Sequence, residues 1–168
     1  MMTEESKAAA ENLPNFGTTE DGQDPAHIVS SEEYVPMVYE ADMHETTPFI
    51  YAVLSQLQIV YLLQSERVGK RKTLPLRLEG FGCQHCCRVG RLGFSRNFPL
   101  RRRALPAKVE DMFHHLQRCT LCPSDIKALL LRLSQEQESD SRKFTSDQLK
   151  AFYDKIWRRL GRDADITT

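Results

Sequence analysis

Residues 82–86 read GCQHC, and residues 115–123 read HLQRCTLCP. The first stretch places two residues between Cys83 and Cys86, so one tight turn brings both sulfur atoms to a single point. The second stretch places His115 and Cys119 four residues apart, on one face of a predicted helix. Two such pairs supply the four nitrogen and sulfur ligands that a tetrahedral zinc ion requires. The sequence therefore predicts a zinc centre that joins two distant segments.

The identity of the fourth ligand is left open by the sequence, because Cys122 forms a second C-x2-C pair with Cys119. Pro123 disfavours helical geometry at Cys122, so His115 is the preferred ligand and Cys122 the alternative. The preferred set is Cys83, Cys86, His115 and Cys119. The segment between the two pairs has 28 residues, 87–114, which is far longer than in a compact DNA-reading finger.

Three further residues adjoin the predicted ligands and are assigned other roles. Cys87 is expected to point away from the metal as a buried or spare thiol, and His85 is expected at the surface or beside the ligands. The same is expected of His114, although an exchange of His114 for His115 stays open. A site filled by thiolates and histidine leaves no position for water, so the zinc is predicted to be structural. No deaminase or zincin motif, phosphate-binding loop or nucleophile elbow accompanies it, and an enzyme is not expected.

The formal net charge is zero, with 23 basic and 23 acidic side chains, but the charges are segregated. Residues 1–47 carry eleven acids and one base, residues 66–103 carry eleven bases and two acids, and residues 104–168 are nearly balanced. This pattern excludes a chain that is basic throughout, and the acidic block is predicted to be disordered. The acidic start also argues against a secretory or organellar leader, and no apolar run is long enough to span a membrane. With five cysteines in such a chain, we expect a reducing compartment, nuclear or cytoplasmic.

Basic side chains surround the first cysteine pair, with Phe81, Phe94 and Phe98 between them. The predicted function is nucleic-acid binding through this basic face, with arginine as the main phosphate donor. The three phenylalanines are expected in the core of a small β layer, not on the binding surface. The alternative is a zinc-braced protein-recognition module without catalytic activity, whose partner has an acidic surface; no small-molecule substrate is evident. The nucleic-acid-binding residues are predicted to be Lys70, Arg71, Lys72, Arg88, Arg91, Arg96, Arg101, Arg102 and Arg103.

Helix signals dominate the part of the chain after residue 46. Thr47 and Pro48 are typical of an N-cap and a first helical position, and Thr145 with Gln148 forms a capping box. Further helices are predicted over about 105–119 and from residue 123 to a polar run at 135–141. Strands are predicted over 74–78 and about 93–98, whereas residues 59–63 suit either a helix or a strand.

The predicted fold is an α+β domain stabilised by zinc, with about four helices and a short antiparallel β element. Its boundaries are placed at residues 47 and 161, between a disordered acidic tail (1–46) and a short C-terminal tail (162–168). The order of its motifs resembles a large family of uncharacterised diatom and algal proteins. The resemblance rests on the basic turn at 69–72, the C-x2-C pair, Phe98-Pro99, the H-x3-C-x2-C-P segment and a terminal helix with Ile156 and Trp157. It implies a zinc-binding module with ligands among Cys83, Cys86, His115, Cys119 and Cys122, and it implies no activity.

Overall fold

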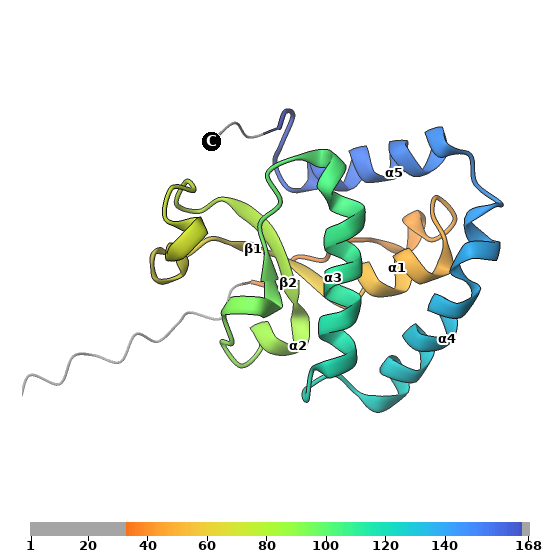
Figure 1. Cartoon of the computed structure of the whole chain (residues 1–168), viewed down its shortest axis with the longest axis horizontal. Helices are drawn as coiled ribbons and strands as arrows, with labels where there is room; N and C mark the ends of the chain where they lie inside the picture. Colours follow the sequence, from red (N-terminus) through yellow and green to blue (C-terminus); the bar gives the residue numbers. More distant parts are fainter. Residues whose placement is uncertain (1–32, 166–168) are drawn as a thin grey trace, which may run out of the picture.

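The computed structural model describes residues 33–165, which form an α+β fold (Figure 1). The α-helices are α1 (Pro48–Leu54), α2 (Gln84–Cys87), α3 (Leu105–Arg118), α4 (Ser124–Ser141) and α5 (Ser146–Arg159). The short 3-10 helices are η1 (Glu40–Asp42), η2 (Gln64–Glu66), η3 (Gly69–Arg71), η4 (Gly93–Ser95) and η5 (Arg102–Ala104). The α+β class predicted from the sequence is confirmed. No helix within this part of the chain is long and apolar enough to cross a bilayer.

The three strands form one antiparallel sheet in the order β1 (Leu57–Tyr61), β2 (Glu79–Cys83) and β3 (Arg96–Asn97). Residue 80 of the central strand must be glycine, because a Cβ atom there would lie 2.2 Å from the backbone oxygen of Asn97 and 2.5 Å from the Phe98 ring. Leu57 lies opposite Cys83 in the β1–β2 register, so this pairing positions the first predicted ligand at the end of β2.

The main core lies where α3 packs against β2 and against the other long helices. In Figure 1, α3 crosses the middle of the molecule, with the sheet on one side and α1, α4 and α5 on the other. Leu105, Met112 and Leu116 of α3 are fully buried in this core together with Trp157 of α5. A second, smaller core contains Phe98 and lies beneath the loops that precede β2. Within the main core, α3 is held between β2 and the helices α1, α4 and α5, which fixes the positions of the side chains at its C-terminal end.

Local capping signals correctly predict where α1 and α5 begin. The Thr47 hydroxyl accepts a hydrogen bond from the Ile50 backbone N–H at 3.2 Å. Thr145 accepts from the Gln148 N–H at 3.1 Å, and the Gln148 side chain accepts from the Thr145 N–H at 2.7 Å. These bonds satisfy amides that the first turn of a helix leaves without partners.

The ordered domain begins earlier than the sequence suggested, because residues 33–46 pack against it. Met37 is fully buried, and the Asp42 carboxylate, also fully buried, accepts hydrogen bonds from Arg159 at 2.6 and 2.9 Å. Lys155 adds an ion pair to Asp42 at 2.7 Å. The acidic composition of this segment suggested a solvated tail, but its acids neutralise basic side chains of α5. The remainder of the predicted tail (1–46), residues 1–32, lies outside the described residues.

Two predicted strands and one helix end also differ from the sequence analysis. Residues 74–78 form turns, and Arg77 has a φ of 62°, which is outside the range of a strand. The alternation of apolar and other side chains around Pro75 therefore does not correspond to an edge strand. Residues 93–95 form η4, which leaves only Arg96–Asn97 as a strand. Helix α4 continues through the polar run to Ser141, since glutamine and glutamate are good helix formers and Arg142 reaches back to Glu138 at 2.5 Å.

Candidate metal centre and adjoining groove

The four preferred ligands come together from two segments of the chain. Cys83 ends β2 and Cys86 lies in α2, while His115 is in the last turn of α3 and Cys119 follows its end. One ligand atom from each of these residues lies within 4.8 Å of the other three, and the three cysteines are buried. None of them forms a disulfide. The cluster is therefore close enough to hold a single metal ion.

The distances between ligand atoms fit a tetrahedral ion. The Cys86 Sγ atom lies 3.6 Å from Cys119 Sγ and 3.5 Å from His115 Nε2. With zinc bond lengths of about 2.3 Å to sulfur and 2.05 Å to nitrogen, a regular tetrahedron requires about 3.8 Å between sulfurs and about 3.6 Å between sulfur and nitrogen. The arrangement thus needs little movement to bind an ion.

Backbone amides surround both of the sulfur atoms that begin a C-x2-C pair. The backbone of His85 and of Cys86 hydrogen-bonds the sulfur of Cys83. In the same way, the backbone of Leu121 and of Cys122 hydrogen-bonds the sulfur of Cys119. Burial raises the pKa of Cys83, because a thiolate is costly in an apolar setting. At Cys119 burial acts in the same direction, but hydrogen bonds from the backbone and the neighbouring thiols outweigh it and lower the pKa. A bound cation would offset the remaining cost of holding several thiolates together.

The histidine ligand is suited to binding in its neutral form. Burial lowers the pKa of His115, and the nearby positive charge of Arg118 lowers it further. A neutral imidazole has a free lone pair for a metal ion. His114 instead points to the surface, with its Nε2 atom 3.9 Å from Glu110, so the exchange of the two histidines is not supported.

The remaining candidates lie beside the cluster. Cys122 is buried, and its sulfur contacts the Pro123 carbonyl oxygen at 3.8 Å; it is not part of the four-atom cluster. Cys87 is partly buried against the smaller core and is not part of the four-atom cluster. His85 is buried, not exposed, and its Nε2 atom lies 3.1 Å from the Gln56 side chain of the loop before β1. This contact attaches the first cysteine turn to the sheet.

A groove opens next to the metal centre and shares His115 with it. The hollow has a volume of about 460 Å³ and lies between α3 and the segment around β3. Its cationic side chains are Arg71, Lys108 and Arg118, and Phe94 of η4 stands on its wall with 97% of its surface exposed. The prediction that Phe94 belongs to a β-layer core is wrong, whereas Phe81 and Phe98 are buried as expected.

Two of the predicted phosphate-binding arginines serve mainly to build this groove. Arg96 is only 3% exposed and lies 3.1 Å from the buried Glu66 carboxylate, so it is a structural residue and not a surface contact. Arg71 donates to the Arg96 carbonyl oxygen at 2.9 Å and covers the Phe98 ring, which leaves it partly exposed at the groove. The Arg96–Glu66 ion pair connects β3 to η2.

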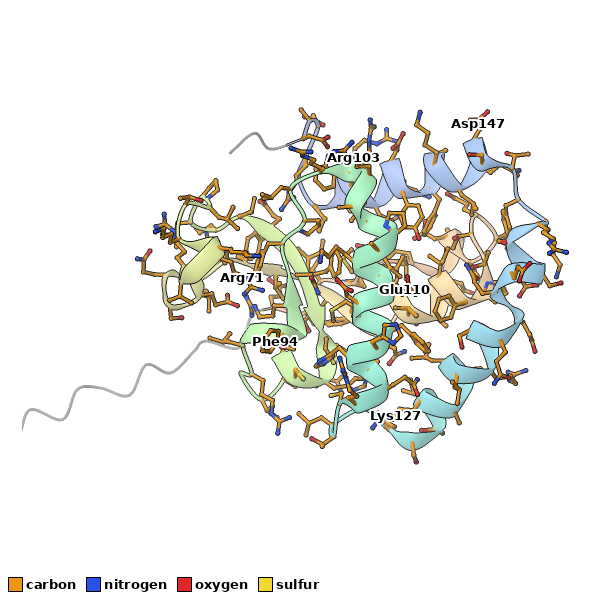
Figure 2. All side chains as sticks on the ribbon, in the orientation of Figure 1. Arg71, Phe94, Arg103, Glu110, Lys127 and Asp147 are labelled. Carbon is orange, nitrogen blue, oxygen red and sulfur yellow. The ribbon has the colours of Figure 1, made fainter. Side chains whose placement is uncertain are left out.

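The other predicted basic residues do not form one continuous face. Lys70 and Lys72 are exposed on the turn beside Arg71, and Arg88 and Arg91 are exposed around the α2 loop. Arg101, Arg102 and Arg103 are exposed too, but Figure 2 shows Arg103 at the N-terminal end of α3, away from Arg71 and Phe94. The triple arginine run thus belongs to a different part of the surface.

Lys108 and Arg118 were missed by the sequence analysis, because the block after residue 103 is nearly neutral. Helical periodicity would have identified them, since Lys108, Asp111, His115 and Arg118 follow one stripe of α3. Asp111 forms an ion pair with Lys108 at 2.7 Å and reduces the positive charge at the Lys108 end of this stripe. The stripe therefore connects the metal ligand directly to the cations of the groove.

Comparisons with protein-family models, curated proteins and solved structures find no match for this chain. The function is accordingly argued from the site itself.

Proposed function

We propose that the protein is a zinc-stabilised module that binds single-stranded nucleic acid in the groove beside the metal centre. The observation that carries this proposal is the exposure of Phe94, 97%, on the wall of a cationic groove. Leaving a phenylalanine in water forgoes about 1.5–3 kcal/mol of burial energy. A partner that covers the ring would recover this energy.

Zinc is the metal that the ligand set favours. Three thiolates and one imidazole in a tetrahedral arrangement are typical of zinc, whereas calcium and magnesium prefer oxygen ligands. Protein side chains supply all four ligands, so we assign the ion a structural role and propose no catalytic activity for it. In this role zinc joins the end of β2 and the α2 turn to the end of α3, whose His115 also lines the groove.

The groove combines the two features with which proteins bind single strands. An aromatic ring provides a platform on which a base stacks, and the cations follow the phosphate backbone. A duplex offers fewer exposed base faces, because its bases are stacked on one another. Phe94 is therefore assigned to base stacking, and Arg118, Lys108 and Arg71 to phosphate contacts.

Fluorescence anisotropy with a short labelled oligothymidylate tests the proposal. We expect Phe94→Ala to weaken binding about 5- to 100-fold, as the loss of one stacked base predicts, and Phe94→Trp to retain it. Val89→Ala is the matched control, because Val89 is 58% exposed in the preceding loop and does not line the groove. Unchanged binding by Phe94→Ala, or equal affinity for a duplex, would contradict the proposal.

The salt dependence of binding tests the phosphate contacts separately. Arg118→Gln should reduce the slope of log K against log salt by about 0.7, the value of one single-strand phosphate contact. Arg132→Gln is the control, since Arg132 is exposed on α4 and does not line the groove.

Protein recognition is the second candidate function. Leu129 and Leu131 of α4 are 40% and 49% exposed, on different faces of the helix, and each leaves apolar surface that a partner could cover. In that case partner binding would be insensitive to salt and to Phe94→Ala, but lost in a Leu129→Asp, Leu131→Asp variant.

A further inference from the structure

A second groove, distant from the metal centre, lies among the helices. One hollow of about 570 Å³ and another of about 450 Å³ share Ile50, Pro106, Gln137 and Tyr153, so they form one continuous depression along α3. We call it the helical groove. Its floor is mostly apolar, and its volume is in the range of small-molecule sites, about 300–1,000 Å³.

The length of the helical groove follows from the α3 residues that line it. Pro106 lines both hollows and Phe113 the far end, so the groove follows two turns of the helix, about 10 Å at 1.5 Å per residue. Phe49 and Phe113 meet edge to face at 5.1 Å and close this end with aromatic surface. An unbranched chain or a flat ring system fits such a channel.

Positive charge is confined to the other end. Arg103 and Lys150 line the first hollow and are exposed, and neither has an ion-pair partner among residues 33–165. Arg102, by contrast, is paired with Asp154 at 3.1 Å. Figure 2 shows Arg103 at the start of α3 and Glu110 farther along the same helix, so charge of opposite sign marks the two ends.

Two neutral polar groups face the shared middle of the helical groove. The Gln137 side-chain oxygen accepts a hydrogen bond from the Thr47 hydroxyl at 2.6 Å, which orients the amide. The Tyr153 hydroxyl has no hydrogen-bond partner in the described part of the chain. Burial raises the pKa of Tyr153 to about 12, so the phenol keeps its proton and remains a donor at neutral pH.

We infer that the helical groove binds a small amphipathic carboxylate, such as a medium-chain acid, with its apolar body along α3 and its carboxylate at Arg103 and Lys150. Apolar surface supplies the affinity, and the two cations at one end determine the orientation. The inference is independent of the proposed nucleic-acid groove, which shares none of these lining residues. The sequence contained no sign of such a site, because its parts come from α1, η5, α3, α4 and α5.

Calorimetric titration and amide NMR with decanoate, kept below its micelle concentration, test the inference on the full chain. We expect saturable binding, with shifts confined to the helical groove, and weaker binding of decan-1-ol and decylammonium. An Arg103→Glu, Lys150→Glu variant should bind decanoate at least about ten-fold more weakly and decan-1-ol unchanged, because only the charge interaction is reversed.

Matched controls separate a specific site from general attraction of anions. Arg132→Glu, Lys127→Glu changes the same number of charges on α4 and should leave decanoate affinity unchanged. Phe94→Ala should also have no effect, so the outcome is distinct from that of the nucleic-acid experiment. The inference is overturned if decanoate does not bind saturably, or if the control variant loses as much decanoate affinity as the Arg103→Glu, Lys150→Glu variant. It is also overturned if decan-1-ol binds more tightly than decanoate, or if the amide shifts map outside the helical groove.

Discussion

Replacing Cys86 by serine is the most informative test of the metal centre. The Cys86 sulfur lies 3.6 Å from the Cys119 sulfur and 3.5 Å from the His115 ring nitrogen. It is therefore in contact with both of the ligands that the C-terminal end of α3 contributes. Serine is the closest match to cysteine in shape, although slightly smaller, and it removes the thiolate that zinc prefers. The substitution therefore opens the link between the two segments with little change in packing.

The size of the effect follows from the loop that a metal ion bound at this cluster would close. Cys86 and His115 are separated by 28 residues. If this link restricts the unfolded chain as a disulfide does, a loop of about 30 residues contributes about 3.6 kcal/mol of stability at 25 °C. Structural zinc contributes about 10–16 kcal/mol of apparent binding energy in small modules. Both values are large beside the total stability of a domain, about 5–15 kcal/mol.

The assay combines metal analysis with thermal and urea unfolding. We expect one zinc ion per wild-type chain and less than half of this in Cys86→Ser. The thermal unfolding midpoint of Cys86→Ser should be lower by at least about 10 °C, the effect of losing the loop closure alone. Cys87→Ser is the matched control, since it replaces the adjacent thiol outside the cluster. Chelator should destabilise the wild type and Cys87→Ser equally, and Cys86→Ser little.

Two further variants distinguish the preferred ligand set from the alternative. His115→Ala should lose zinc, whereas Cys122→Ser should retain it and keep the thiolate-to-metal absorption of the cobalt-substituted protein. The reasoning is refuted if Cys86→Ser holds zinc with wild-type stability, or if Cys122→Ser loses the metal while His115→Ala retains it.

Three other substitutions test the fold around the site. Asp42→Asn should cost about 3 kcal/mol in urea unfolding, because it breaks a buried pair with Arg159. Burial favours protonation of Asp42, but hydrogen bonds from basic side chains outweigh this effect and lower its pKa. The ionised Asp42 therefore stabilises the fold fully above about pH 4, and this stabilisation is lost as pH falls through the folded-state pKa. The Asp42→Asn variant should lack this loss of stability in acid. Gly80→Ala should cost about 3 kcal/mol or prevent folding, since its Cβ would overlap the Asn97 backbone. Thr145→Ala should cost about 1 kcal/mol and lower the thermal midpoint by a few degrees, by removing an N-cap.

Features that depend on neighbours in sequence were predictable. The spacing of Cys83 with Cys86 and of His115 with Cys119 depends on a turn and on a helix, and both can be read from short segments. The capping box at Thr145 is equally local. In each case the residues that cooperate lie within four positions of one another.

Apart from the meeting of the two ligand pairs, features that depend on distant partners were not predictable. Arg96 is indistinguishable from its basic neighbours in sequence, and only Glu66, thirty positions earlier, turns it into a buried residue. The inclusion of residues 33–46 in the domain depends on Asp42 meeting Arg159, 117 positions away. Phe94 was assigned to the core because most phenylalanines are buried, and no local signal shows that η4 leaves it exposed.

The position of Phe94 in the chain links the metal centre to the proposed binding groove. Phe94 and Lys108 both belong to the 28-residue segment whose ends are held at Cys86 and His115. Removal of the metal should therefore abolish oligothymidylate binding together with stability, because the two walls of the groove lose their common anchor. Phe94→Ala should weaken oligothymidylate binding, with the zinc content and the unfolding midpoint unchanged. A chain that binds oligothymidylate equally well with and without zinc would show that the groove does not depend on the metal centre.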